Sequence, residues 1–141
     1  MTLDLKEWYH LEYLKLGDHS DTRSMVKHLD DFFKMLKTHI VKITIFILGE
    51  SIYWHKDLIQ SFVNEGHEIT IHGWDHQLLG EKSNEIFKSQ ILQTKENLER
   101  LFGCEVIGYR ALCFSMSNGK FKILESIELK YGSSFIISYW T

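Results

Sequence analysis

Residues 69–76, ITIHGWDH, mark the end of a strand, and the elements on either side of them indicate the fold. The stretch begins with alternating β-branched residues, which is typical of a strand, and ends with two imidazoles, His72 and His76. Gly73 permits a sharp turn between them. A divalent metal needs neutral nitrogen ligands that converge at ~2.0–2.1 Å, and one further carboxylate ligand leaves a position open for water. The spacing therefore indicates a metal site, although two histidines at this spacing also occur by chance in a chain with eight.

Two elements are expected directly before this stretch. Residues 41–48, VKITIFIL, are almost all apolar or β-branched, as in a strand buried on both faces, and Gly49 closes it. A helix follows and is expected to end at Gly66, a common C-cap residue. Its inward residues are Leu58, Ile59, Phe62 and Val63. An earlier helix begins at Asp21, and its apolar residues at helical spacing are Met25, Leu29, Phe32, Phe33, Leu36 and Ile40. Residues 2–5 are apolar enough for a very short strand.

Four more elements are expected after the histidines. Ser83 is a suitable N-cap for a helix that ends at Gly103. Its apolar residues are Ile86, Phe87, Ile91, Leu98 and Leu101. Residues 105–112 are expected to form a strand, residues 118–129 a helix, and residues 133–139 a final strand. The inward residues of that last helix are Phe121, Leu124 and Ile127.

Strands that alternate with helices predict an α/β fold with mostly parallel strands joined by right-handed crossovers. In such folds the chemistry lies at the carboxyl ends of the strands. Asp4, His72 and Arg110 all fall at or near such ends, so we expect them to meet at one edge of the sheet.

Composition limits the class of protein. The chain has 141 residues, 44% of them hydrophobic, which fits one domain over residues 1–141. A formal charge of -3 with interleaved acidic residues argues against nucleic-acid binding. We find no membrane span and no signal peptide, and therefore expect a cytoplasmic protein. Cys104 and Cys113 are interpreted as reduced, buried small hydrophobes.

Four motifs in order resemble one family. Residues 44–79, TIFILGESIYWHKDLIQSFVNEGHEITIHGWDHQLL, resemble the central stretch of the NodB-homology polysaccharide deacetylases, carbohydrate esterase family four. The opening TLDLKEWYH resembles the TVDVEDWFH start of a branch associated with exopolysaccharide and surface-glycan gene clusters, such as those for lipopolysaccharide. IGYRALCFSM resembles the family's GYRAPxFS motif, and KYGSSF its YDSS segment. The resemblance spans nearly all of the chain.

The resemblance implies an incomplete or distorted (β/α) barrel and metal-dependent N-deacetylation of an acetylated amino sugar. It assigns Asp4 as the general base, held and oriented by Arg110. The metal, expected to be zinc, would be bound by His72 and His76 together with a carboxylate of the first motif. The residues expected at the substrate are Trp8, Tyr9, Trp74 and Tyr109. For the first three, simple packing at the rim of the barrel is an equally good interpretation.

Several positions depart from the family pattern. The first motif has Lys6 and Glu7 where the family has acidic residues, so the third metal ligand is expected to be Glu7, or else Asp4 itself. Leu112 replaces the Pro of the third motif and Gly132 the Asp of the fourth. The late motif that supplies the family's catalytic acid has no counterpart in this sequence.

These departures leave three functions open. In the first, the chain is a minimal hydrolase whose catalytic acid comes from His10 or from a partner chain. In the second, it is an inactive glycan- or metal-binding module. In the third, it is a shortened product that is stabilised by self-association. Residues 133–140, SSFIISYW, are apolar, β-rich and uncharged, which favours pairing with a second copy or a partner chain that completes the barrel. The alternative is a central strand covered by the chain's own helices.

Overall fold

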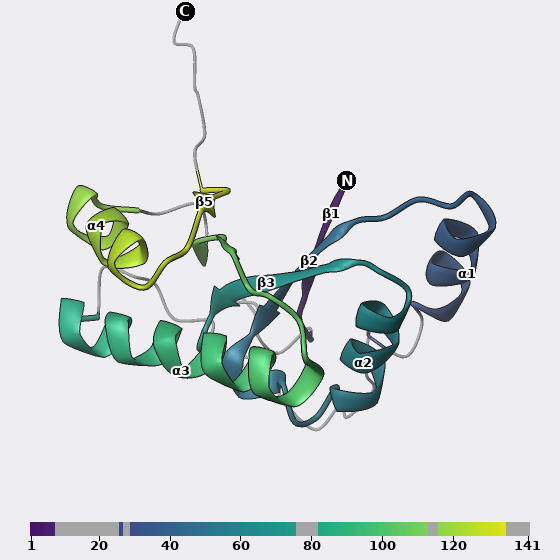
Figure 1. Ribbon diagram of the computed structural model, residues 1–141, viewed down its shortest axis with the longest axis horizontal. Helices are drawn as coiled ribbons and strands as arrows, with labels where there is room; N and C mark the ends of the chain where they lie inside the picture. Colours follow the sequence, from purple (N-terminus) through teal and green to yellow (C-terminus); the bar gives the residue numbers. More distant parts are fainter. Residues whose placement is uncertain (8–25, 27–28, 76–81, 113–115, 135–141) are drawn as a thin grey trace, which may run out of the picture.

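The computed structural model describes residues 1–7, 26, 29–75, 82–112 and 116–134. Within these ranges, strands and helices alternate along the chain, and all paired strands are parallel (Figure 1). The elements are β1 (Thr2–Leu5), α1 (Asp30–Thr38), β2 (Thr44–Leu48), a short 3-10 helix (Gly49–Ser51), α2 (Lys56–Asn64), β3 (Glu68–Gly73), α3 (Asn84–Phe102), β4 (Gly108–Tyr109), α4 (Asn118–Ser126) and β5 (Tyr131–Gly132). The prediction of an α/β fold with mostly parallel strands is confirmed.

The strand order in the sheet is β1-β2-β3-β4-β5. Each new strand therefore joins beside the one before it, which is the order in the wall of a (β/α) barrel. A doubly wound sheet would instead reverse direction part-way through. In the described residues β1 pairs with β2 alone and β5 with β4 alone, so these five strands form an open arc of such a wall.

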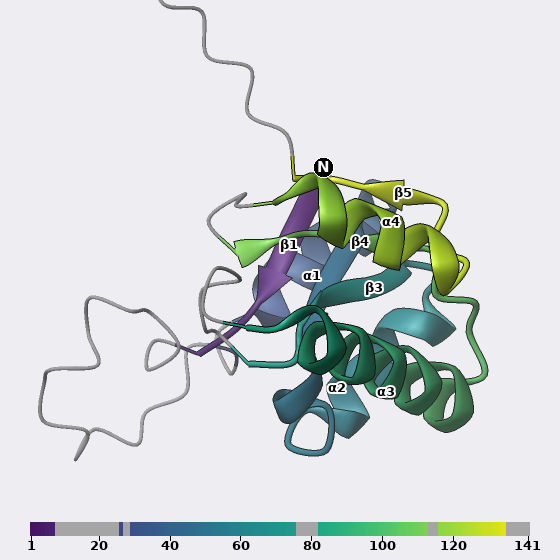
Figure 2. The same ribbon diagram turned by 90° about the vertical axis from the view of Figure 1, so that its left-hand side faces the viewer.

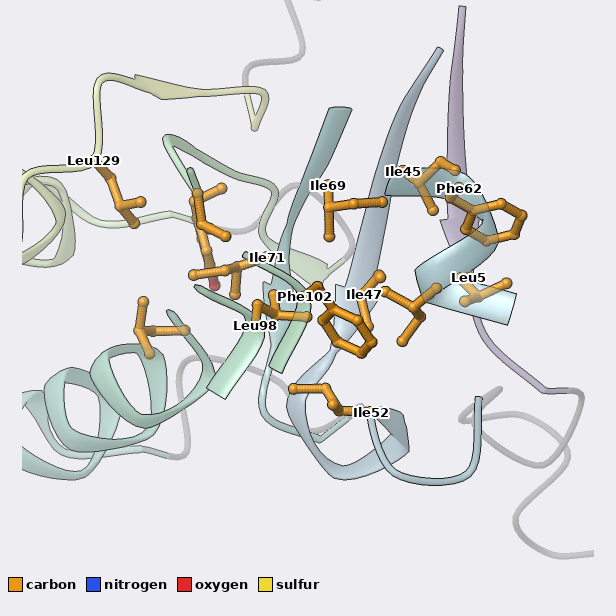
Figure 3. Packing of buried hydrophobic residues seen from close by; sticks show 14 of the residues in the cluster. Leu5, Ile45, Ile47, Ile52, Phe62, Ile69, Ile71, Leu98, Phe102 and Leu129 are labelled. Carbon is orange, nitrogen blue, oxygen red and sulfur yellow. The ribbon is translucent and has the colours of Figure 1, made fainter. Parts of the chain in front are cut away.

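One face of the sheet is packed against helices. Because side chains of a strand alternate between faces, Ile45 and Ile47 of β2 share a face with Ile69 and Ile71 of β3. All four are buried in a cluster that includes residues of α2 and α3. Figure 3 shows these isoleucines with Leu98 and Phe102 of α3, and Figure 2 shows α2 and α3 on the same side of β3. The opposite face carries the paired residues Asp4, Phe46 and Thr70.

The expected ends of the third helix are confirmed. The Ser83 side chain accepts a hydrogen bond from the backbone N–H of Ile86 at 3.3 Å. Gly103 ends the helix with φ 65°, a left-handed conformation that favours glycine. Ile86, however, is exposed and not inward. It precedes Phe87, the first residue of the buried stripe, by one position and is thus rotated about 100° away from that stripe.

Other predicted boundaries were too wide. The strand expected over residues 105–112 is only β4, and the helix expected over residues 118–129 ends at Ser126. The last described strand, β5, precedes residues 133–139, most of which lie outside the described ranges. The first described helix is α1, and Ile40, expected to be inward, is 83% exposed beyond its end. The earlier part of the helix expected from Asp21, with Met25, lies mostly outside the described residues. No helix in the described part of the chain is long and apolar enough to cross a membrane.

Candidate active site

The Arg110 guanidinium brings the carboxyl ends of distant strands together. Its Nη1 donates a hydrogen bond to Oδ1 of Asp4 on β1 at 2.7 Å, and its Cζ lies 4.0 Å from the centre of the Phe46 ring on β2. In a flat sheet β1 and β4 would be about 14 Å apart, three strand spacings. The contact therefore shows that the sheet is curled, with this polar face on its inside. The predicted pairing of Arg110 with Asp4 is observed, and the arginine side chain is 11% exposed.

Two hydroxyls that sequence reasoning missed also bind Arg110. Its Nη2 donates to Oγ1 of Thr2 at 3.1 Å and to Oγ of Ser133 at 3.0 Å. Thr2 belongs to β1 and Ser133 follows β5, so one guanidinium contacts both edges of the described sheet. Both residues stand inside quoted motifs, TLD and YGSS, but a hydroxyl on a strand carries no signal of its partner.

His72 is buried beside the same carboxylate. Its Nδ1 lies 3.0 Å from the backbone oxygen of Arg110, so an Nδ1–H donates to that carbonyl and Nε2 keeps its lone pair. Nε2 is 3.5 Å from Oδ2 of Asp4. Burial lowers the pKa of His72. The Asp4 carboxylate and the hydrogen bond to the Arg110 backbone oxygen oppose this, while the charges of Lys6 and Arg110 act in the same direction as burial. At neutral pH the imidazole is therefore neutral, which is the form that binds a metal.

A bulge in β3 determines where His72 points. Ile71 is paired with Ile47, but Gly73 is paired with Leu48, so His72 is an extra residue opposite the β2 strand. Bulges of this kind re-aim a side chain and are common next to active sites. Gly73 has φ 112°, a conformation that a residue with a side chain rarely adopts.

His72 and Asp4 have the separation expected of two ligands of one divalent ion, but they make up only part of a metal site. Two ligands at ~2.1 Å from one tetrahedral zinc are ~3.4 Å apart, close to the 3.5 Å between His72 Nε2 and Asp4 Oδ2. His76, the other predicted histidine ligand, lies outside the described residues. Among the residues that are described, no three His, Cys, Asp or Glu side chains converge as a metal site.

Glu7, the expected third ligand, does not join this pair. Its side chain is 3% exposed, and its Oε1 lies 3.7 Å from Nε2 of His55. Glu7 is three residues after Asp4, an odd spacing, and in an extended chain such residues point to opposite sides. The structure thus leaves Asp4 as the first-motif carboxylate at His72.

The four aromatic residues predicted to bind substrate lie in different surroundings. Trp8 and Tyr9 lie outside the described residues. The half-buried Trp74 ring packs against Gly49, where an added Cβ would lie 2.6 Å from ring atom Cε3. Tyr109 is a core residue with no exposed surface, and its ring meets Phe87 edge-on at 5.8 Å. The expectation that Tyr109 contacts substrate was wrong, because this position of β4 faces the helices and the next residue, Arg110, faces inward.

The sequence matches the polysaccharide deacetylase family over residues 18–132. The chain belongs to this family. It is 36% identical to the peptidoglycan-N-acetylglucosamine deacetylase of Bacillus cereus over 90 residues, which make up 64% of this chain and 31% of that protein. It is 39% identical to the peptidoglycan-N-acetylglucosamine deacetylase PgdA of Listeria monocytogenes over 61 residues, 43% of this chain and 13% of that protein. The matched region is therefore about a third or less of each curated relative.

Solved structures of the family share the fold. A polysaccharide deacetylase from Mycobacterium smegmatis superposes with a TM-score of 0.69 at 28% identity, covering 73% of this chain and 36% of that one. A pseudoenzyme of carbohydrate esterase family four from Bacillus anthracis has a TM-score of 0.74 at 18% identity, covering 93% and 41%. The second likeness, at this identity, concerns the fold alone.

Proposed function

We propose that this polysaccharide deacetylase family member carries part of a metal-dependent site that removes N-acetyl groups from amino sugars. The observation that supports this best is the joint position of Asp4 and His72, 3.5 Å apart and both fixed by Arg110. A half-buried carboxylate beside a buried, neutral imidazole is suited to a divalent cation, and zinc is the ion we propose. His76 is the further ligand that we propose from the sequence.

The chain's own residues have separate tasks in this reaction. When bound, a divalent ion lowers the pKa of a water molecule and polarises an acetyl carbonyl. Oδ2 of Asp4 faces the same space as His72 Nε2, so it can hold the ion or accept a proton from water there. Arg110 binds the other oxygen, Oδ1, and thereby keeps the carboxylate in place. The acid for the leaving amine is proposed to come from His10, outside the described residues, or from a partner chain.

The substrate we propose is an acetylated amino-sugar glycan. Peptidoglycan is favoured by the names of the two curated relatives. The surface-glycan context and the cytoplasmic location expected from the sequence stay predictions, as does a partner chain that completes the barrel.

Acetate release tests this proposal. The purified protein is incubated with zinc and, in separate reactions, with N-acetylglucosamine oligomers, peptidoglycan fragments and an N-acetylated sugar nucleotide. We expect acetate and a free amine from at least one glycan, and no acetate from His72→Ala. His39→Ala, a change at an exposed histidine, is the matched control and should behave as the wild type. Zinc-loaded wild type that releases no acetate from any of them would contradict the proposal.

A further inference from the structure

An ion pair closes the connection between β3 and α3. Lys82 Nζ contacts Oδ1 of Asp75, and the two side chains are 7% and 19% exposed. The same Nζ donates a hydrogen bond to Oε1 of Gln90 on α3 at 2.9 Å. A buried ammonium group is costly unless it is paired and hydrogen-bonded, and Lys82 meets both conditions. The side chain is thus held in one defined direction.

Lys82 is also held through its backbone by the next helix. Nζ of Lys120, in the first turn of α4, donates to the backbone oxygen of Lys82 at 3.2 Å. Lys120 is itself 7% exposed and lies 5.7 Å from the ring centre of Phe87 on α3. Residues of α3 and α4 therefore both hold Lys82, at the far end of the connection.

The near end of the connection is fixed against the 3-10 helix that follows β2. The backbone oxygen of Trp74 accepts a hydrogen bond from the N–H of Glu50 at 2.8 Å, and the Trp74 ring packs against Gly49. Asp75 follows directly and is three residues after His72. The Asp75–Lys82 ion pair thus joins two fixed ends of the connection that leads away from the imidazole.

We infer that Asp75 and Lys82 are positioning residues for the metal-binding imidazole. Their ion pair holds the backbone at Asp75, three residues after His72, and this preorganises the ligand for a divalent cation. The inference rests on the proposed function, because it concerns affinity for the same ion. Groups that hydrogen-bond a metal ligand directly change metal affinity by about 10–100-fold. Asp75 and Lys82 act on His72 through the backbone, so we expect an effect at the lower end of that range.

The first measurement is made on the full chain without metal. Amide hydrogen exchange is followed for Asp75→Asn, for Lys82→Met and for the double variant. We expect faster exchange over residues 74–83 in both single variants, with exchange in β2 unchanged. Lys95→Met is the matched control, because it breaks another ion pair of α3, between Nζ and Glu99 Oε1 at 3.0 Å. Exchange over residues 74–83 that is unchanged in both single variants would overturn the inference.

The second measurement is titration with zinc alone. We expect the zinc dissociation constant to rise about tenfold or more in Asp75→Asn and Lys82→Met, but not in Lys95→Met. In the double variant the two effects should not add, as for residues that act through one contact. Lys82→Arg, which keeps the charge, should restore most of the affinity. If the wild type binds zinc and the variants bind it equally or more tightly, the positioning role is wrong and the proposed function stands. If the wild type binds no zinc, the proposed metal-dependent function is itself wrong.

Discussion

At the scale of single residues, Arg110 holds the candidate site together through its contacts with several strands. Its two terminal nitrogens bind Asp4, Thr2 and Ser133, and its plane covers the Phe46 ring. An arginine can do this because its donors are arranged in a rigid planar fork. Since the pair is largely withdrawn from water, removal of one partner leaves the other charge poorly solvated.

Asp4→Ala should therefore be more costly than the loss of a surface carboxylate. Loss of one member of a fully buried pair costs about 3–5 kcal/mol, and because the Asp4 side chain is 26% exposed we expect about 2 kcal/mol. Urea unfolding measures this change in the free energy of unfolding. Glu96→Ala, an exposed change on α3, is the control. Equal losses in the two variants would mean that Arg110 is adequately solvated without Asp4.

Gly108 is required by a tyrosine of the neighbouring strand. A Cβ at this position would lie 2.3 Å from ring atom Cζ of Tyr131, whose hydroxyl donates to Oε1 of Glu68 at 2.9 Å. Gly108→Ala should thus displace the ring and destabilise the fold by about 1–3 kcal/mol. Gly119→Ala in α4 is the matched control, because its Cβ would meet no atom closer than 3.9 Å. Thermal melts of the two variants that coincide would contradict this explanation of Gly108.

At the scale of elements, His67 links the starts of β2 and β3. Its Nδ1 accepts a hydrogen bond from the backbone N–H of Ile43 at 3.3 Å, and its ring packs edge-on against Phe33 and Phe62. The side chain is 1% exposed. Only an unprotonated Nδ1 can accept that bond, so this junction needs the neutral imidazole.

The junction predicts a pH dependence of stability. Burial, and secondarily Lys42, lower the pKa of His67 in the folded state, while Glu65 opposes them. The unfolded chain therefore binds more protons below about pH 6.5, and stability should fall as the pH drops from 7 to 5. His72, whose pKa is lowered as well, acts in the same direction. We expect His67→Gln, measured by melting temperature at both pH values, to lose less stability between them than the wild type does. An unchanged difference would exclude His67 as a source.

At the scale of the whole molecule, the described sheet is a curled arc with two edges. The curl follows from the contacts of Arg110 with β1 and with Ser133, and the helices contact the outer face (Figures 1 and 2). The edges at β1 and β5 carry backbone groups that can pair with another strand. A second copy or a partner chain that continues the wall is therefore the assembly we propose.

Light scattering coupled to size exclusion tests this assembly. At micromolar concentration we expect a species heavier than the 16.7 kDa chain, which dissociates on dilution or on truncation after Ser134. A single species at the chain mass, unaffected by either change, would exclude self-association.

Local sequence alone predicted the alternation of strands and helices, though not all of their bounds. The apolar run of residues 41–48 and the Ser83 and Gly103 caps act through neighbours in the chain, so their outcome was predictable. The alternation of these elements, together with the motifs, also predicts that Asp4, His72 and Arg110 meet at one edge of the sheet. That prediction needs only the rule that parallel strands share their carboxyl ends.

The tertiary structure decided where each side chain at that edge points. Glu7 meets His55, Tyr109 is buried among the helices, and the bulge in β3 re-aims His72. The contacts of Arg110 with Ser133 and of Lys82 with Asp75 likewise have no signal in spacing. In each case the deciding quantity is strand register, the curl of the sheet or the path of a connection. These depend on packing between segments distant in the sequence, which no local pattern of residues encodes.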